Sequence, residues 1–268
     1  MESGTRMRKK DRKAFILRRL TEKSSVSVSE LGEAFGLSGV SVRKLLDEME
    51  RDGTIRRTWG GAVGANGSLG EPSFAEKEGR SLKEKQAIAR AAYDLIQDGD
   101  AVFLDSGTTT VHLARLLAAG EKRKVLVCTN ALSVAAELQR AEDLQILLIG
   151  GEFRHRILSC TGSIACEALK SLFFDKGFIT GNHFSLERGI TTPSLAEAEV
   201  KRAVLAASKE TFALIDYSKY GGDSLSLVAP ISGVGTLITD WRALPETVRR
   251  LEEKGVRVFL AKPEEVIV

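Results

Sequence analysis

The sequence has little of several things that would mark other classes of protein. Aromatic residues make up 6% of its 268 residues, and it contains five prolines and three cysteines. Cys128, Cys160 and Cys166 show no metal-ligand spacing, so we expect reduced, partly buried thiols and no metal site. No apolar run reaches the roughly 18 residues of a membrane span, and the charged N-terminus has no signal-peptide core. We therefore expect a cytoplasmic protein without a membrane partner.

Net charge is also small, at +3, but it is unevenly distributed. Residues 1–62 contain 14 Lys and Arg against 9 Asp and Glu, and the remainder contains 25 against 27. A basic head on a slightly acidic body indicates that only the head meets a polyanion. The composition is that of a soluble globular protein, and the length allows two domains that each bury a core.

In the head, two short helical patterns are joined by a glycine, and a further helix is expected before them over residues 11–22. Ser29 predicts the start of the first helix of the pair, and Gly36 suits the left-handed residue that ends it. Ser38 predicts the start of the second helix, which runs to about Arg51. Its buried face is expected to consist of Val42, Leu45, Leu46 and Met49.

This pattern predicts a winged helix-turn-helix, whose second helix enters the major groove of double-stranded DNA. Arg and Lys on its exposed face can bind guanine edges or phosphates, and wing arginines can meet phosphates or the minor groove. Ile55 of the wing is expected to point inward, and Arg56 and Arg57 outward. A helical protein-interaction domain with solvated charges is the alternative. The predicted DNA-binding residues are Ser38, Ser41, Arg43, Lys44, Arg56 and Arg57.

Residues 26–63 resemble the head of DeoR-type bacterial transcriptional regulators, whose usual pattern is VSVxELAxxFxVSxxTIRRDLxxLExxGxLxRxHGGA. The match covers nearly the whole head. Lys44 stands in place of an Arg, Leu45 in place of an Asp, and Trp59 in place of a His. These departures leave room for a base preference that differs from that of the relatives.

After a linker rich in Gly and Ser over residues 64–81, apolar strand patterns alternate with amphipathic helices. Strands that are apolar throughout and alternate with helices predict a parallel sheet covered on both faces. The expected organisation is a winged helix-turn-helix over residues 1–63 and a mostly parallel α/β domain over residues 82–268. The strands are expected at 101–105, 124–129, 144–151, 176–180, 211–216, 235–240 and 256–260.

Ligands of such sheets bind outside the carboxyl ends of the strands. Residues 105–110, DSGTTT, follow the first strand there. A Gly among hydroxyl residues at the start of a helix offers backbone N–H groups and a positive helix end, which suit a phosphate. Simple capping of the helix by Ser106 or Thr108 is the alternative. With amide, Arg and Lys side chains after later strands, the rim suits a small phosphorylated polyol.

The rim residues also resemble the sensor domain of DeoR-type regulators, which shows DSGTTT, TN, GGxxR, GADGI followed by GLTT, EAxVKRAM and DxSKxG in this order. The resemblance implies a fold similar to ribose-5-phosphate isomerase, a phosphorylated sugar or polyol as effector, and repression of a carbohydrate-use operon. Glu197 and Lys201 match family positions, although their spacing equally fits an ion pair on a helix surface. The implied effector contacts are Asp105, Ser106, Gly107, Thr108, Thr109, Asn130, Arg154, Asn182 and Lys219.

The body departs from that pattern at residues 180–184, TGNHF, where GADGI is usual. Asn182 stands in place of an Asp; it can form hydrogen bonds but cannot take up a proton at neutral pH. His183 adds bulk and a titratable ring. The pocket therefore binds either a different metabolite or none, in which case the body serves assembly.

We expect a homodimer or homotetramer, because a single head makes few base contacts. An effector would release the operator DNA by shifting the body between two arrangements. The alternatives are a sugar-phosphate isomerase or deaminase, and a regulator whose body binds no metabolite. Asn182 in place of a carboxylate and the DNA-binding head argue against an enzyme, so no catalytic residue or cofactor is expected.

Overall fold

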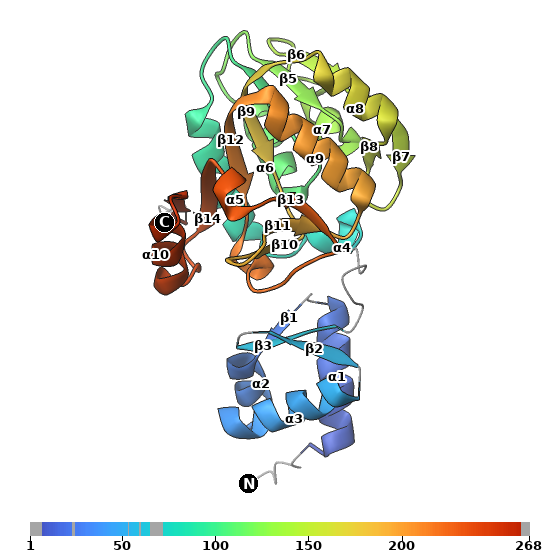
Figure 1. Ribbon diagram of the computed structural model, residues 1–268, viewed down its shortest axis with the longest axis vertical. Coiled ribbons are helices and arrows are strands. Elements are labelled where there is room, and N and C mark those ends of the chain that lie inside the picture. Colours follow the sequence, from blue (N-terminus) through green and yellow to red (C-terminus); the bar gives the residue numbers. More distant parts are fainter. Residues whose placement is uncertain (1–6, 23–24, 53, 59, 65–71, 264–268) are drawn as a thin grey trace. The chain divides into compact units, whose positions relative to one another are not determined.

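The computed structural model describes residues 7–22, 25–52, 54–58, 60–64 and 72–263. They belong to two compact units, Met1–Gly70 and Glu71–Val268, which we call the head and the body (Figure 1). No helix in the described ranges is long and apolar enough to cross a membrane.

The head is a winged helix-turn-helix, as expected. Its three strands form an antiparallel sheet in the order β1-β3-β2, and its core includes Ile16, Leu31, Val42, Leu46 and Ile55. The elements are α1 (Lys9–Glu22), β1 (Ser25–Ser27), α2 (Val28–Phe35), α3 (Gly39–Arg51), β2 (Ile55–Thr58) and β3 (Gly61–Gly64).

The turn between α2 and α3 follows the predicted chemistry except at its start. Gly36 ends α2 in the left-handed region, with φ 61°, and the Ser38 hydroxyl accepts a hydrogen bond from the N–H of Ser41 at 3.4 Å. The predicted cap at Ser29 is wrong, because Ser27 caps α2 and accepts from the N–H of Glu30 at 3.0 Å. Ser27 pairs with Gly61 in the sheet, so the chain leaves β1 and enters the helix two residues earlier.

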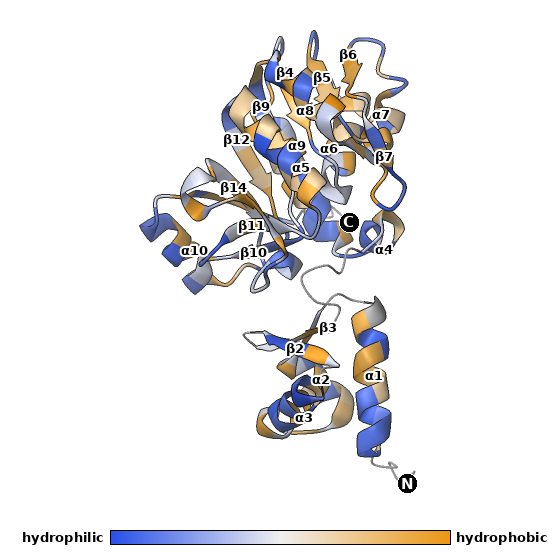
Figure 2. Cartoon of the chain, turned by 45° about the vertical axis from the view of Figure 1, so that its right-hand side comes forward, coloured by the Kyte–Doolittle hydropathy of each residue, from blue (hydrophilic) through white to orange (hydrophobic). Residues whose placement is uncertain are grey.

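The body is built on a parallel sheet in the order β15-β14-β12-β9-β4-β5-β6. Side chains alternate along its strands, so Val102 and Leu104 face one apolar cluster and Phe103 the other. Figure 2 shows these strands mostly in the apolar colour. The strands are β4 (Ala101–Leu104), β5 (Leu126–Thr129), β6 (Gln145–Leu148), β9 (Phe174–Ile179), β12 (Ser208–Leu214), β14 (Thr236–Asp240) and β15 (Arg257–Ala261).

Helices cover both faces of this sheet, which confirms the predicted α/β architecture. One apolar cluster holds residues of α5, α6 and α7, and the other holds residues of α8, α9 and α10. The helices are α4 (Phe74–Glu78), α5 (Leu82–Leu95), α6 (Thr108–Ala119), α7 (Leu132–Leu138), α8 (Ser163–Lys170), α9 (Leu195–Ala207) and α10 (Pro245–Glu253), and η1 (Tyr217–Lys219) is a 3-10 turn.

Two small antiparallel sheets were not expected from the sequence. One has the order β10-β11-β13 and the other is the hairpin β7-β8. Each of their strands has only three or four residues, too few to show a periodic pattern. They are β7 (Glu152–Arg154), β8 (Ser159–Thr161), β10 (His183–Ser185), β11 (Gly189–Thr192) and β13 (Ser226–Ala229).

The segment expected to link the domains, residues 64–81, includes α4. Its capping box joins Ser73 and Glu76, and Phe74 packs against the apolar cluster of α5 and α6. The N–H of Phe74 donates to the main-chain oxygen of Arg156 at 2.8 Å. Residues 65–71 of that segment lie outside the described residues. The later part of the segment is thus folded onto the body.

Candidate functional site

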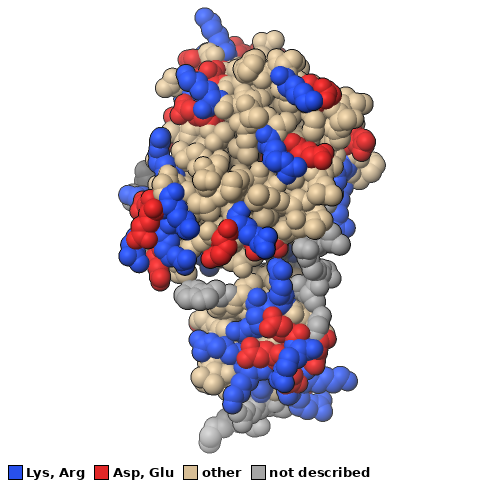
Figure 3. Space-filling model, in the orientation of Figure 1, with Lys and Arg blue, Asp and Glu red and all other residues tan. Residues whose placement is uncertain are grey.

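The exposed face of α3 carries the side chains predicted to bind DNA. Ser41, Arg43 and Lys44 are exposed, while Val42 on the same turn is buried. Figure 3 shows Lys and Arg side chains over the head together with acidic ones on the face drawn. A row of exposed cations on a helix that follows a tight turn is the arrangement that inserts into a major groove.

The two arginines of the wing face different ways, which corrects the expectation that both point outward. Arg56 is exposed, whereas the Arg57 side chain is 21% exposed and its Nε lies 3.5 Å from Asp47 Oδ1 of α3. The N–H of Arg57 also donates to Glu50 at 2.5 Å. Side chains alternate along a strand, so Arg57 shares the inner face with Ile55. Arg57 therefore holds strand β2 of the wing against α3.

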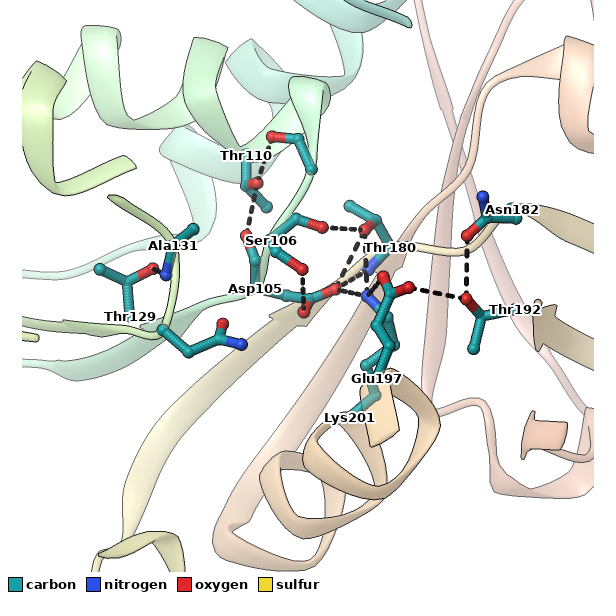
Figure 4. Close-up of polar contacts among 12 residues, drawn as sticks. Asp105, Ser106, Thr110, Thr129, Ala131, Thr180, Asn182, Thr192, Glu197 and Lys201 are labelled. Atoms are coloured by element: carbon teal, nitrogen blue, oxygen red, sulfur yellow. Dashed lines mark hydrogen bonds and ion pairs between the residues drawn. The ribbon is translucent and has the colours of Figure 1, made fainter. Parts of the chain in front are cut away.

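In the body, three elements bring Asp105, Thr180 and Lys201 together at the carboxyl ends of β4 and β9 (Figure 4). Asp105 is fully buried. Its Oδ2 accepts from the N–H of Thr180 at 2.9 Å, from the Thr180 hydroxyl at 3.0 Å, and from Lys201 Nζ. One carboxylate thus ties α9 to the central strands of the sheet.

Lys201 and Glu197 of α9 are buried, so they are not an ion pair on a helix surface. Their side chains are 1% and 5% exposed, and Lys201 Nζ lies 3.3 Å from Glu197 Oε1. Burial disfavours both charges, but the attraction of Asp105 and Glu197 outweighs it and holds the pKa of Lys201 above its usual value. Burial likewise opposes ionisation of Glu197, yet Lys201 keeps the pKa of this carboxyl below its usual value.

A polar chain extends from Glu197 through Thr192 to Asn182, as Figure 4 shows. The Thr192 hydroxyl lies 2.9 Å from Glu197 Oε2 and 3.0 Å from Asn182 Oδ1, but it can donate its proton to only one acceptor. The carboxylate is the stronger acceptor. If the Asn182 amide is turned by 180°, its NH2 group donates to the Thr192 hydroxyl, which keeps Glu197 as its own acceptor. An ionised Asp could not donate there.

The N-terminus of α6 lies beside this network. Its first residue is preceded by Gly107, and no side chain caps it, so the alternative of simple capping by Ser106 or Thr108 is not observed. A Cβ on Gly107 would lie 2.7 Å from the Thr180 hydroxyl, so only glycine allows this close approach. Ser106, Thr108 and Thr109 are buried around it. The helix therefore presents uncapped N–H groups at the strand ends.

The remaining predicted contacts lie around the same rim. Arg154 Nη1 is 3.7 Å from Glu197 Oε2, so the β7-β8 hairpin adds a cation to the network. Asn130 donates to the main-chain oxygen of Cys160 at 2.8 Å, and its own Oδ1 is buried without a partner among the described residues. Lys219 is half-buried in η1, and among the described residues no hydrogen bond or ion pair joins it to the network. His183 Nδ1 lies 2.7 Å from the Ser224 hydroxyl.

Sequence reasoning missed Thr180 and Thr192 as members of the network. Thr180 had a usable signal, because it ends a predicted strand beside the predicted position of Asp105. Thr192 also had a signal, because GITT at residues 189–192 resembles the family's GLTT, although β11 was not foreseen. Within the described ranges, no group of three or more His, Cys, Asp or Glu side chains could hold a metal ion.

Two family models match the chain. One, described as the DeoR-like helix-turn-helix domain, matches residues 12–66, and the other, described as the DeoR C terminal sensor domain, matches residues 80–241. The transcriptional repressor AccR of Agrobacterium fabrum is 33% identical, over 92% of this chain and 96% of its own length. The lactose phosphotransferase system repressor of Lactococcus lactis is 32% identical, over 92% of this chain and 97% of its own length.

Solved structures match more distantly. Ribose 5-phosphate isomerase A of Neisseria gonorrhoeae is 15% identical, with a TM-score of 0.37 over 51% of this chain and 52% of that one. Eukaryotic initiation factor subunit eIF2B delta of Chaetomium thermophilum is 14% identical, with a TM-score of 0.42 over 78% of this chain and 63% of that one. These similarities concern the fold.

Proposed function

Because this chain belongs to the DeoR family of helix-turn-helix transcriptional regulators, we propose that it represses a carbohydrate-use operon and that a phosphorylated sugar or polyol controls it. The observation that supports this most is the uncapped N-terminus of α6 at the strand ends, beside a buried network of carboxylates, hydroxyls and cations. The lactose phosphotransferase system repressor, named for a sugar system, supports the pathway class. Like its relatives, the chain is a regulator and not an enzyme.

In this proposal the phosphate binds at the start of α6, where the backbone N–H groups and the hydroxyls of Ser106, Thr108 and Thr109 act as donors. The hydroxyls of the ligand lie toward Asn182 and Arg154. Asp105 already accepts three hydrogen bonds, so it holds the rim in shape more than it contacts the ligand. Asn130, with its buried unpartnered oxygen, and Lys219 complete the site.

DNA is bound through the head, which we assign to residues 1–63, with the effector domain over residues 82–268. Arg43 and Lys44 contact base edges or phosphates, Ser38 and Ser41 contact phosphates, and Arg56 meets the backbone beside the groove. Arg57 contributes by fixing the wing on α3. A homodimer or homotetramer supplies a head for each half of the operator, and the protein acts in the cytoplasm, where bacterial DNA lies.

A thermal-shift screen of the full chain tests the proposal. The panel pairs phosphorylated sugars, polyols and sugar acids with their unphosphorylated forms. We expect one phosphorylated compound to raise Tm and to release DNA taken from upstream of the gene's own operon. Thr109→Val at the start of α6 should lose the response, and Thr247→Val in α10 should keep it. If no phosphorylated compound binds the wild-type chain, the body is not a sugar-phosphate sensor.

A further inference from the structure

Val40 is an apolar side chain on the exposed face of α3, the helix that follows the tight turn of the head. It is the second residue of that helix, and 60% of it is exposed. The apolar cluster of the head does not include it. A β-branched residue also favours a helix less than alanine does, because the preceding turn restricts its side chain. Neither packing nor helix stability therefore explains a valine at this position.

The cations of α3 lie on the same face as Val40. Arg43 and Lys44 follow it by three and four residues, and both are exposed, so the three side chains are neighbours on the helix surface. Side chains of a helix tilt toward its N-terminus. Arg43 does so, because a Cβ on Gly39 would lie 3.7 Å from Arg43 Nη1. A guanidinium group and the two methyl groups of Val40 thus share the first turn of α3.

The charges of α3 differ between its two halves. In the second half, Asp47 lies 3.5 Å from Arg57 of the wing, and Glu48 is paired with lysines of α1. In the first half, no ion pair or side-chain hydrogen bond with another described residue involves Arg43 or Lys44. The face around Val40 is therefore positively charged without internal neutralisation, which is complementary to the phosphates on both sides of a major groove.

We propose that Val40 contacts the 5-methyl group of a thymine in the operator. The first residues of a recognition helix meet the base edges, and the thymine methyl is the apolar group that the major groove offers there. Packing does not require the glycine before Val40, since a Cβ on Gly39 would lie at an ordinary 3.4 Å from Val28 Cγ1. The missing side chain leaves room for DNA beside Val40. The inference rests on the proposed function, because it needs DNA bound through α3.

The test measures how far binding depends on one methyl group. Duplexes that bind the wild-type full chain are selected from random-sequence DNA, so the operator need not be known beforehand. Each thymine of the selected site is then replaced in turn with uracil, which lacks only the 5-methyl group. Affinity should fall by about three- to fivefold at one thymine of each half-site, the effect of no longer burying one methyl-sized group. Equal binding of every thymine and uracil pair by the wild type overturns the inference.

Val40→Ala shows which side chain contacts the methyl group. The variant should keep its Tm, because the side chain is exposed, and it should bind the thymine and uracil duplexes equally at that position. Leu17→Ala, at another exposed apolar residue of the head on α1, should keep the wild-type preference for thymine. A double-mutant cycle over protein and DNA gives the coupling between Val40 and the methyl group. If Val40→Ala retains the full preference for thymine, the inference is wrong.

Arg43→Ala separates a failure of this inference from a failure of the proposed function. If a sequence is selected and Arg43→Ala weakens its binding, but uracil has no effect at any position, DNA binding through α3 stands and the role of Val40 falls. If no sequence is selected and Arg43→Ala binds every duplex as the wild type does, both fall.

Discussion

Two lysines of the body are almost equally buried but differ in what surrounds them. Lys201 on α9 lies against Asp105 and Glu197, and its pKa is raised. Lys85 on α5 has a main-chain oxygen as its partner, and its pKa is lowered. The first charge is balanced by the fold itself and holds α9 against the sheet. Among the described residues no carboxylate forms an ion pair with the second charge, and the more distant Asp216 only partly offsets the cost of burying it.

The largest effect should come from removing the balanced charge. Lys201→Met removes the buried cation that pairs with both Asp105 and Glu197, and we expect a loss of about 3–5 kcal/mol in the free energy of unfolding. Urea unfolding of the full chain measures it, with Lys209→Met on the exposed start of β12 as the control. A loss no larger than that of the control would show that Lys201 does not hold the network together.

The next largest effect should be a dependence of the free energy of unfolding on pH, caused by the lowered pKa of Lys85. The folded-state pKa of Lys85 is about 8, against an ordinary 10.5, so its cost to the fold is complete below pH 8. Between pH 8 and pH 10.5, Lys85 has lost its proton in the folded chain but keeps it in the unfolded chain. The free energy of unfolding of the wild type should therefore rise by up to about 3 kcal/mol relative to that of Lys85→Met. Urea unfolding of both chains near pH 7 and near pH 10 gives the difference. A constant difference would contradict the lowered pKa.

A smaller effect is expected at the far end of the network. Asn182→Asp replaces the donor to Thr192 with a carboxylate near Glu197, and the folded chain should lose about 1–3 kcal/mol at neutral pH. The new carboxyl needs a proton to donate, so its pKa in the folded chain is raised and the loss should shrink as the pH falls. Unfolding at two pH values measures this, and Gln139→Glu, at the exposed residue that follows α7, controls for the added charge. The same loss at both pH values would argue against the donor role of Asn182.

The smallest effect on stability should come from the head's exposed cations. Arg43→Ala and Lys44→Ala remove side chains that α3 does not bury, so unfolding should change by less than about 0.5 kcal/mol. DNA binding should weaken by about 1–3 kcal/mol where the residue reads a base. Titration of the operator with each variant, beside Lys10→Ala on exposed α1, measures this. Unchanged DNA affinity in both variants would remove α3 from the reading role.

Local sequence signals predicted the elements well where they were long or bounded by special residues. Gly36 and Ser38 marked the turn of the head, and the apolar runs after Asp100 marked the parallel strands. The start of α2 was wrong because pairing of Ser27 with Gly61, a distant residue, set it. Arg57 was wrong although the two-residue period of a strand already places it on the face of Ile55; what the sequence did not encode is its ion pair with Asp47 of α3.

The sequence alone determined the two-part organisation, the helix-turn-helix and the strand-end position of Asp105 to Thr110, because caps, turns and periodic apolar patterns act over a few residues. Only the tertiary structure decided which charges are buried and which of them are paired. The spacing of Glu197 and Lys201 fitted an ion pair on a helix surface as well as the family positions, and nothing in the sequence singled out Lys85. Their roles follow from packing against Asp105 and α4, since the energy of a charge depends on neighbours that the chain brings from far away.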